Sequence, residues 1–123
     1  MSIKTADKIF ADAVKARDNW ICQYCLQPIN KYTSLEFFDC SHFRKRSRYQ
    51  TRWSMRNCVS AHRECHNEYE LDPKKHTKFW VDRIGQDEVD ELIQLSNAPL
   101  PTFKSFYGSR EHLKELRERK YHE

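Results

Sequence analysis

The sequence has little glycine and no long hydrophobic run. With two glycines in 123 residues and 33% charged residues, it is unlike a β-sandwich or barrel, which needs many tight turns, and helices are favoured. No apolar stretch approaches the roughly 18 residues of a membrane span, and residues 1–8 lack the apolar core of a signal peptide. We therefore expect a cytoplasmic protein with no membrane partner.

The five cysteines do not suit a disulfide framework, because an odd number leaves one thiol over and a reducing compartment opposes disulfides. Two pairs of metal ligands, each with two residues between its members, stand out instead: Cys22, Cys25, His62 and Cys65. Thiolates and imidazole in two such knuckles are the tetrahedral set that zinc prefers, so they predict a structural Zn²⁺ that helps a small core to fold. Cys40 and Cys58 are alternatives to His62 as the fourth ligand, or they fill space as small buried groups.

Acidic residues are missing from residues 41–63, where seven basic residues gather. The rest of the chain holds 15 basic and 18 acidic residues, so the net charge of +4 conceals a local positive field. Such a field attracts phosphates, which makes DNA the first partner to consider. The alternative is a solubilising surface, as charge runs usually are. The expected phosphate contacts are Arg44, Lys45, Arg46, Arg48, Arg52 and Arg56.

Length and periodicity indicate a single domain, residues 1–123, that is α+β and mostly helical. Its core, about residues 19–72, loses the helical period between the two ligand pairs, where aromatic and β-branched residues predict strands. A helical extension covers about residues 74–121. The strands are expected at residues 34–43 and near 52–53.

Helices are expected on both sides of this core. The first is capped by Thr5 and runs to about Arg17. Pro73 stops a helix that opens at His62, and Gly85 separates the two helices that follow. These helices are predicted over residues 62–70, 75–83, 87–95 and 110–120.

A second group of polar residues lies between and beside the ligand pairs. Asp39 and His42 are on the aromatic strand, Asn57 precedes the second pair, and His66 follows it. This order resembles the HNH (His-Me finger, ββα-metal) nucleases, and the resemblance implies a zinc-stapled ββα-metal core. It also implies His42 as the general base that activates water, Asn57 as the residue that positions this base, and His66 as a ligand of a catalytic divalent metal, Mg²⁺ or Mn²⁺.

Phosphodiester hydrolysis needs these residue types. Imidazole titrates near neutral pH and can take a proton from water, and a divalent cation offsets the charge that develops on the phosphate and the leaving oxygen. Asp39 is a second expected metal ligand, brought in by a bulge at Cys40 and Ser41, or else a cap of the strand end.

The longer pattern is similar to the phage lambda NinG (Rap) recombination proteins. It comprises Asp39-x-x-His42-Phe43, Arg52-Trp53 and Asn57 with its knuckle, and it continues through most of residues 8–120. The resemblance implies a structure-selective DNA endonuclease that acts on branched recombination intermediates, in the host cytoplasm if a phage encodes it. Symmetric cutting of such junctions would favour a homodimer. The alternative function is a non-catalytic zinc-finger module that binds DNA or a recombination partner.

Overall fold

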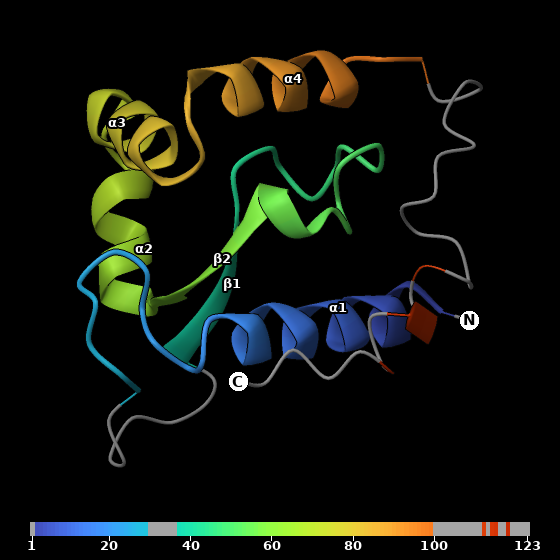
Figure 1. Cartoon of the computed structure of the whole chain (residues 1–123), viewed down its shortest axis with the longest axis horizontal. Helices are drawn as coiled ribbons and strands as arrows, with labels where there is room; N and C mark the ends of the chain where they lie inside the picture. Colours follow the sequence, from blue (N-terminus) through green and yellow to red (C-terminus); the bar gives the residue numbers. More distant parts are fainter. Residues whose placement is uncertain (1, 30–36, 100–111, 113, 116–117, 119–123) are drawn as a thin grey trace.

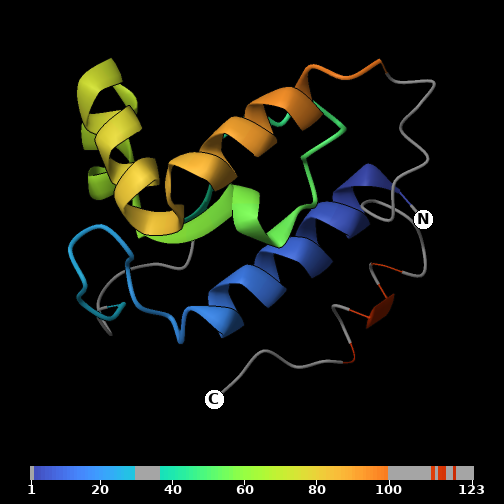
Figure 2. The same ribbon diagram turned by 45° about the horizontal axis from the view of Figure 1, so that its top comes forward.

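The computed structural model describes residues 2–29, 37–99, 112, 114–115 and 118. Within them, helices surround a two-stranded antiparallel sheet, as predicted for a mostly helical α+β protein. Figures 1 and 2 show α1 on one side of the β1–β2 hairpin and α4 on the other, with α2 and α3 beyond one end. The elements are α1 (Ile3–Arg17), β1 (Phe38–His42), β2 (Cys58–His62), α2 (Arg63–Glu70), α3 (Pro73–Ile84) and α4 (Gln86–Ser96).

Helix α1 covers one face of the hairpin. Its N-cap is Ser2, not Thr5 as predicted, because the Ser2 hydroxyl accepts a hydrogen bond from the Thr5 backbone N–H at 3.1 Å. An apolar stripe of this helix is buried against the sheet, where it meets Trp53 and Cys58. The buried residues of α1 are Ala6, Phe10, Ala13 and Val14.

The second strand is Cys58–His62, and the predicted strand near residues 52–53 is wrong. Residues 51–53 form a turn, and a short 3₁₀ helix, Met55–Asn57, leads into β2. The first four residues of β2 are all buried, so its small side chains show no alternation of polar and apolar residues that would mark a half-exposed strand. The register runs without a bulge from Phe38 opposite His62 to His42 opposite Cys58.

The later helices begin and end within about three residues of the predicted bounds. Helix α2 follows β2 directly, with His62 as its N-cap residue. Asp72 caps α3, where Pro73 takes the first helical position, and Gly85, at φ 89°, separates α3 from α4. The predicted helix 110–120 falls mostly outside the described residues. No described helix has the length and apolar character that crossing a bilayer requires.

A buried carboxylate, that of Asp18, links the end of α1 to β2 and α3. Asp18, directly after α1, accepts a hydrogen bond from the Ser60 backbone N–H of β2 at 2.8 Å and pairs with Arg83 of α3 at 3.4 Å. It also pairs with Arg17, whose guanidinium donates to the Met55 and Cys58 carbonyls. These bonds fix the end of α1 against the strand whose last residue enters the candidate metal centre.

Candidate metal centre and active-site cavity

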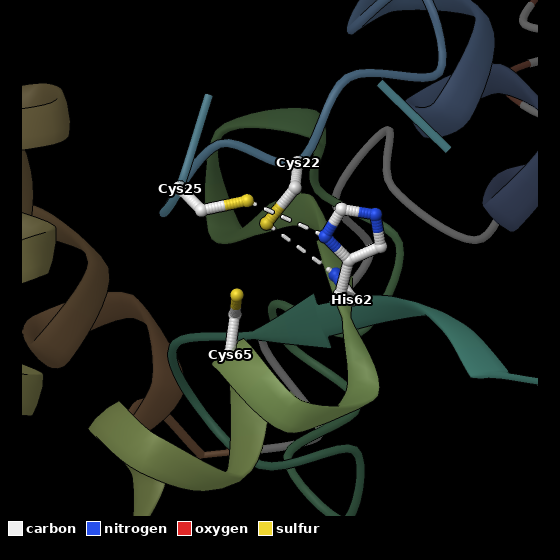
Figure 3. A group of neighbouring side chains, drawn as sticks. All are labelled: Cys22, Cys25, His62 and Cys65. Carbon is white, nitrogen blue, oxygen red and sulfur yellow. Dashed lines mark hydrogen bonds between the residues drawn. The ribbon is translucent and has the colours of Figure 1, made fainter. Parts of the chain in front are cut away.

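The structure brings the two predicted ligand pairs together. Cys22 and Cys25 lie on the loop after α1, His62 ends β2, and Cys65 is in the first turn of α2; their side chains point toward one another (Figure 3). One ligand atom from each lies within 4.8 Å of all the others, and the Cys25 Sγ is 3.4 Å from the His62 Nδ1. Three thiols and one imidazole at such separations could hold zinc. Cys40 and Cys58 lie outside this group.

Backbone hydrogen bonds shape the first knuckle. The Leu26 N–H donates to the Cys22 carbonyl at 2.8 Å, and Leu26 takes a left-handed conformation, φ 63°, that turns the chain back. The returning segment pairs Ile21 with Pro28 in a β-bridge, while the Gln23 N–H donates to the Ser60 carbonyl at 2.9 Å. The knuckle is thus attached to β2 and arrives beside its last residue.

The thiols affect one another's ionisation. Burial opposes loss of the Cys22 proton, but backbone N–H groups of Cys25, His62 and Tyr24 outweigh it and lower the pKa of this thiol. Burial and the neighbouring sulfurs of Cys22 and Cys25 raise the pKa of Cys65 to about 12. Cys65 therefore needs a cation beside its sulfur before its thiol can ionise at neutral pH.

A cavity of about 600 Å³ lies beside this centre, between α1, β1 and α2. Three of the predicted catalytic residues line it: Asp39 and His42 from β1, and His66 from α2. Cationic side chains from α1, α2 and the loop after β1 also line it, namely Lys15, Lys45, Arg46 and Arg63. An anionic ligand such as a phosphate would find compensating charge there.

His42 is largely buried on the face of β1 that packs against α1. Its ring lies 6.0 Å from that of Phe10, and its Nε2 is 2.9 Å from the Arg52 carbonyl. Donation to this carbonyl places the proton on Nε2 and leaves Nδ1 as the acceptor. Burial, with the charges of Arg46 and Arg52, lowers the pKa of His42 to about 4, although its backbone hydrogen bonds oppose this shift. The ring is therefore neutral at pH 7, the form that a general base requires.

The Asn57 side chain is fully buried and holds the loop that follows His42. Its amide oxygen accepts from the Arg44 N–H at 2.9 Å, and its amide nitrogen donates to the Arg44 and Thr51 carbonyls, each at 3.1 Å. The Asn57 carbonyl also accepts from the Phe43 N–H at 2.7 Å. These bonds close the loop between the end of β1 and the turn that supplies the Arg52 carbonyl to His42.

Asp39 and His66 touch even though β1 has no bulge. The His66 Nδ1 lies 3.1 Å from the Asp39 Oδ2, because α2 follows β2 directly and crosses the face of β1 that carries Asp39. The cost of burying Asp39 is outweighed by Arg63 and His66, which lower the pKa of its carboxyl. The carboxylate is therefore ionised at neutral pH and, with His66, could hold a divalent cation.

Two residues beside this pair were not predicted. Arg63 pairs with Asp39 at 3.0 Å, and Glu70 lies 3.9 Å from the His66 Nε2, on the far side of the ring. A carboxylate behind a histidine orients the ring and favours binding through its other nitrogen. The spacing of four residues between His66 and Glu70 on the predicted helix is the signal that could have found Glu70.

The predicted DNA contacts divide into two groups. Arg52 is 8% exposed and forms a bidentate pair with Asp7 of α1, and Arg56 pairs with Glu88 and Glu91 of α4. Each of these two arginines pairs with carboxylates within the fold, and each carboxylate lies more than 30 residues from its arginine along the sequence. Arg44 donates to the Ser96 hydroxyl at 2.7 Å. The exposed cations are Lys45, Arg46 and Arg48.

Comparison with known families agrees with this geometry. Residues 22–70 match the family model of the HNH endonucleases, a span that contains both ligand pairs, His42, Asn57 and His66. The match supports the HNH family and suggests a nuclease or DNA-binding function; the family also has non-catalytic members. No curated protein and no solved structure matches the chain significantly, so no relative supports the narrower similarity to the NinG proteins.

Proposed function

We propose that the protein is a metal-dependent DNA endonuclease of the HNH type, with His42 as general base. The observation that carries this proposal is the single cavity lined by a neutral imidazole, His42, and by a touching carboxylate and imidazole, Asp39 and His66. A base and a divalent-cation site that line one cavity are what hydrolysis of a phosphodiester needs.

Two metals have separate tasks in this proposal. Cys22, Cys25, His62 and Cys65 hold a structural Zn²⁺, which their mutual proximity supports. Asp39 and His66 hold a catalytic Mg²⁺ or Mn²⁺, which supplies charge stabilisation to the scissile phosphate when bound. Glu70 keeps the His66 ring turned toward Asp39.

The protein's own residues then carry the proton transfer. His42 accepts a proton from water at Nδ1, while its Nε2 donates to the Arg52 carbonyl and keeps the ring in this tautomer. Asn57 positions the loop that supplies this carbonyl. Arg63, now paired with Asp39, is close enough to the cation site to contact the phosphate that arrives there.

The DNA backbone follows the exposed cations Lys45, Arg46 and Arg48, with Arg44 beside them, while Arg52 and Arg56 hold the loop in shape. The similarity to the NinG proteins favours branched DNA as the substrate. Symmetric cutting of a four-way junction would require two active sites, so we expect a homodimer on such a junction, to be measured by sedimentation with and without DNA.

A nicking assay tests the catalytic assignment. Zinc-loaded protein is incubated with Mg²⁺ or Mn²⁺ on linear duplex and on four-way junction DNA, beside His42→Ala. We expect His42→Ala to cut at least about 100-fold more slowly, because a general base contributes roughly 10² to 10⁴ in rate. Gel-shift affinity in Ca²⁺ and the melting temperature serve as controls and should stay close to wild type. Equal cutting by both proteins would refute the role of His42, and binding without cutting by either would favour the non-catalytic module.

A further inference from the structure

We propose a second thiol-imidazole metal site at the other end of the hairpin, formed by Cys40, His42 and Cys58. One ligand atom from each of the three lies within 4.8 Å of the other two. None of the three belongs to the Cys22 group, which gathers at the end where Phe38 faces His62. The site would take a thiophilic cation such as Zn²⁺, Cd²⁺ or Cu⁺.

The register of the hairpin creates this triangle. His42 pairs directly with Cys58, and Cys40 lies two residues before His42, so the three side chains share one face of the sheet. This is the face that packs against α1, where both Cys40 and Cys58 contact the apolar cluster around Phe10. The three ligands therefore come from paired residues of one hairpin, which limits how far they can move apart.

The separations suit a soft cation. Zinc binds sulfur at about 2.3 Å and imidazole nitrogen at about 2.0 Å, so neighbouring ligand atoms in a tetrahedral site lie roughly 3.5 Å apart. The observed separations, up to 4.8 Å, require shifts on the order of 1 Å, which side-chain rotation supplies. Mg²⁺ and Mn²⁺ prefer oxygen ligands and would not compete for two thiolates.

The site opens toward the active-site cavity. Cys58 is 1% exposed, whereas Cys40 and His42 both line the cavity, so a cation would enter from that side. Three protein ligands leave a fourth tetrahedral position for water or another small ligand from the cavity. A cation held there binds a ring nitrogen of His42. If the proposed nuclease function is correct, this removes the general base, and excess zinc switches cutting off.

Metal counting tests the site independently of catalysis. Wild type and Cys40→Ser are equilibrated with micromolar free Zn²⁺, and bound zinc per chain is measured by native mass spectrometry. We expect Cys40→Ser, which keeps the size of the side chain but loses the thiolate, to hold one zinc ion fewer than wild type, whatever the Asp39–His66 pair binds in both. His42→Ala should also hold one fewer. Equal zinc counts in wild type and Cys40→Ser would overturn the proposal.

A spectroscopic readout covers the case in which a variant folds poorly. Co²⁺ added to wild type that already holds one Zn²⁺ should produce thiolate-to-Co²⁺ charge-transfer absorption, and Cys40→Ser should produce at least about 5-fold less. Equal absorption in the two proteins would contradict the site. Melting curves of both proteins at one zinc per chain identify any loss of folding, and Cys58→Ser provides an independent removal of a second ligand.

The regulatory consequence needs a third comparison. Each protein's cutting rate in Mg²⁺ is measured with one zinc per chain and again with excess free Zn²⁺. Excess Zn²⁺ should lower the cutting rate of wild type at least about 10-fold. It should lower the cutting rate of Cys40→Ser less than about 2-fold, each compared with the same protein at one zinc per chain. Equal inhibition of both would refute the switch. If neither protein cuts DNA, the nuclease proposal fails, while the zinc counts still decide whether the site exists.

Discussion

The neutral form of His42 leads to a prediction about pH. An ordinary histidine with a pKa of 6.5 would be half protonated near that pH, but burial and nearby arginines lower the pKa of His42 to about 4. Above its pKa the ring lacks the second proton and can act as a base. We therefore expect the single-turnover cutting rate to stay level, as far as His42 is concerned, from pH 8 to pH 6, and to fall only near pH 5 and below.

The charge of Arg46 provides the matched test. Arg46→Gln removes one of the cations that oppose protonation of His42, so the fall in rate should move to higher pH. The measurement is the pH profile of both proteins at saturating DNA. A wild-type profile that falls by half near pH 6.5 would mean that another group, or a solvated His42, is the base.

Asn57 should stabilise the fold as well as position the base. Asn57→Ala leaves the buried Thr51 carbonyl and the partly buried Arg44 N–H and carbonyl without this partner. We expect a loss of about 3 kcal/mol in the free energy of unfolding, since each buried group left unpaired costs roughly 1 to 3 kcal/mol. Urea unfolding of both proteins, at the same zinc concentration, measures this difference in the free energy of unfolding. A loss below about 1 kcal/mol would show that water replaces the amide.

Individual residues also show what a sequence can and cannot reveal about the site. The knuckles, His42, Asn57 and His66 were predicted from their spacing along the chain, and the structure brings the knuckles together and places His42 and His66 along one cavity. The partners of Arg52 and Arg56 were not, because Asp7, Glu88 and Glu91 are distant in sequence and nothing local links them. A basic run without acidic neighbours was therefore interpreted as more exposed than it is.

At the level of elements, the structural zinc that we propose would join the first knuckle, β2 and α2. Cys25→Ala should lose zinc and unfold the knuckle, because metal binding supplies folding free energy to the segments that the site joins. Cys25 is exposed, so the loss of packing contributes little. Melting temperature and zinc content are measured together, and we expect the melting temperature to fall by more than about 10 °C.

Leu26→Ala is the control for this change. Leu26 is the next residue along the same loop, is 68% exposed and has no ligand atom, so its variant should melt within about 2 °C of wild type. A Cys25→Ala protein that melts like Leu26→Ala would contradict the structural role of the zinc.

The elements also explain the one misassigned strand. Helices α1, α3 and α4 carry clear apolar stripes and caps, so their positions follow from local pattern. Strand β2 is short, consists mainly of small residues and is buried on both faces, so its sequence does not alternate between polar and apolar residues. The aromatic Trp53, in contrast, gave residues 52–53 a false strand signal. The proximity of Cys40, His42 and Cys58 depends on the true register and was therefore hidden from the sequence.

At the scale of the whole molecule, the exposed cations of the loop after β1 should govern the DNA binding that we propose. Lys45 and Arg48 are exposed on the loop after β1, whereas Arg56 pairs with α4. Replacing Lys45 and Arg48 together with glutamine should weaken binding to any DNA sequence. It should also reduce the slope of log affinity against log salt by about 2, since each phosphate contact contributes roughly 0.9.

Arg56→Gln removes one positive charge, against two in the double variant, at an ion pair within the fold. We expect it to lower stability while leaving the salt slope almost unchanged. Affinity is measured by fluorescence anisotropy over a range of salt concentrations. A slope reduced by about 1 in Arg56→Gln would mean that net charge alone, and not the exposed surface, determines binding.

Cys65 and His66 are neighbours in the first turn of α2, one facing the candidate zinc centre and the other the cavity. A treatment that strips zinc would loosen this turn and swing the His66 ring away from Asp39, even with magnesium in excess. Loss of cutting after EDTA would therefore not identify the hydrolytic metal. If cutting recovers on adding back Mg²⁺ alone, zinc had stayed in place. If cutting recovers only when both ions are added, the position of His66 depends on the zinc bound beside it.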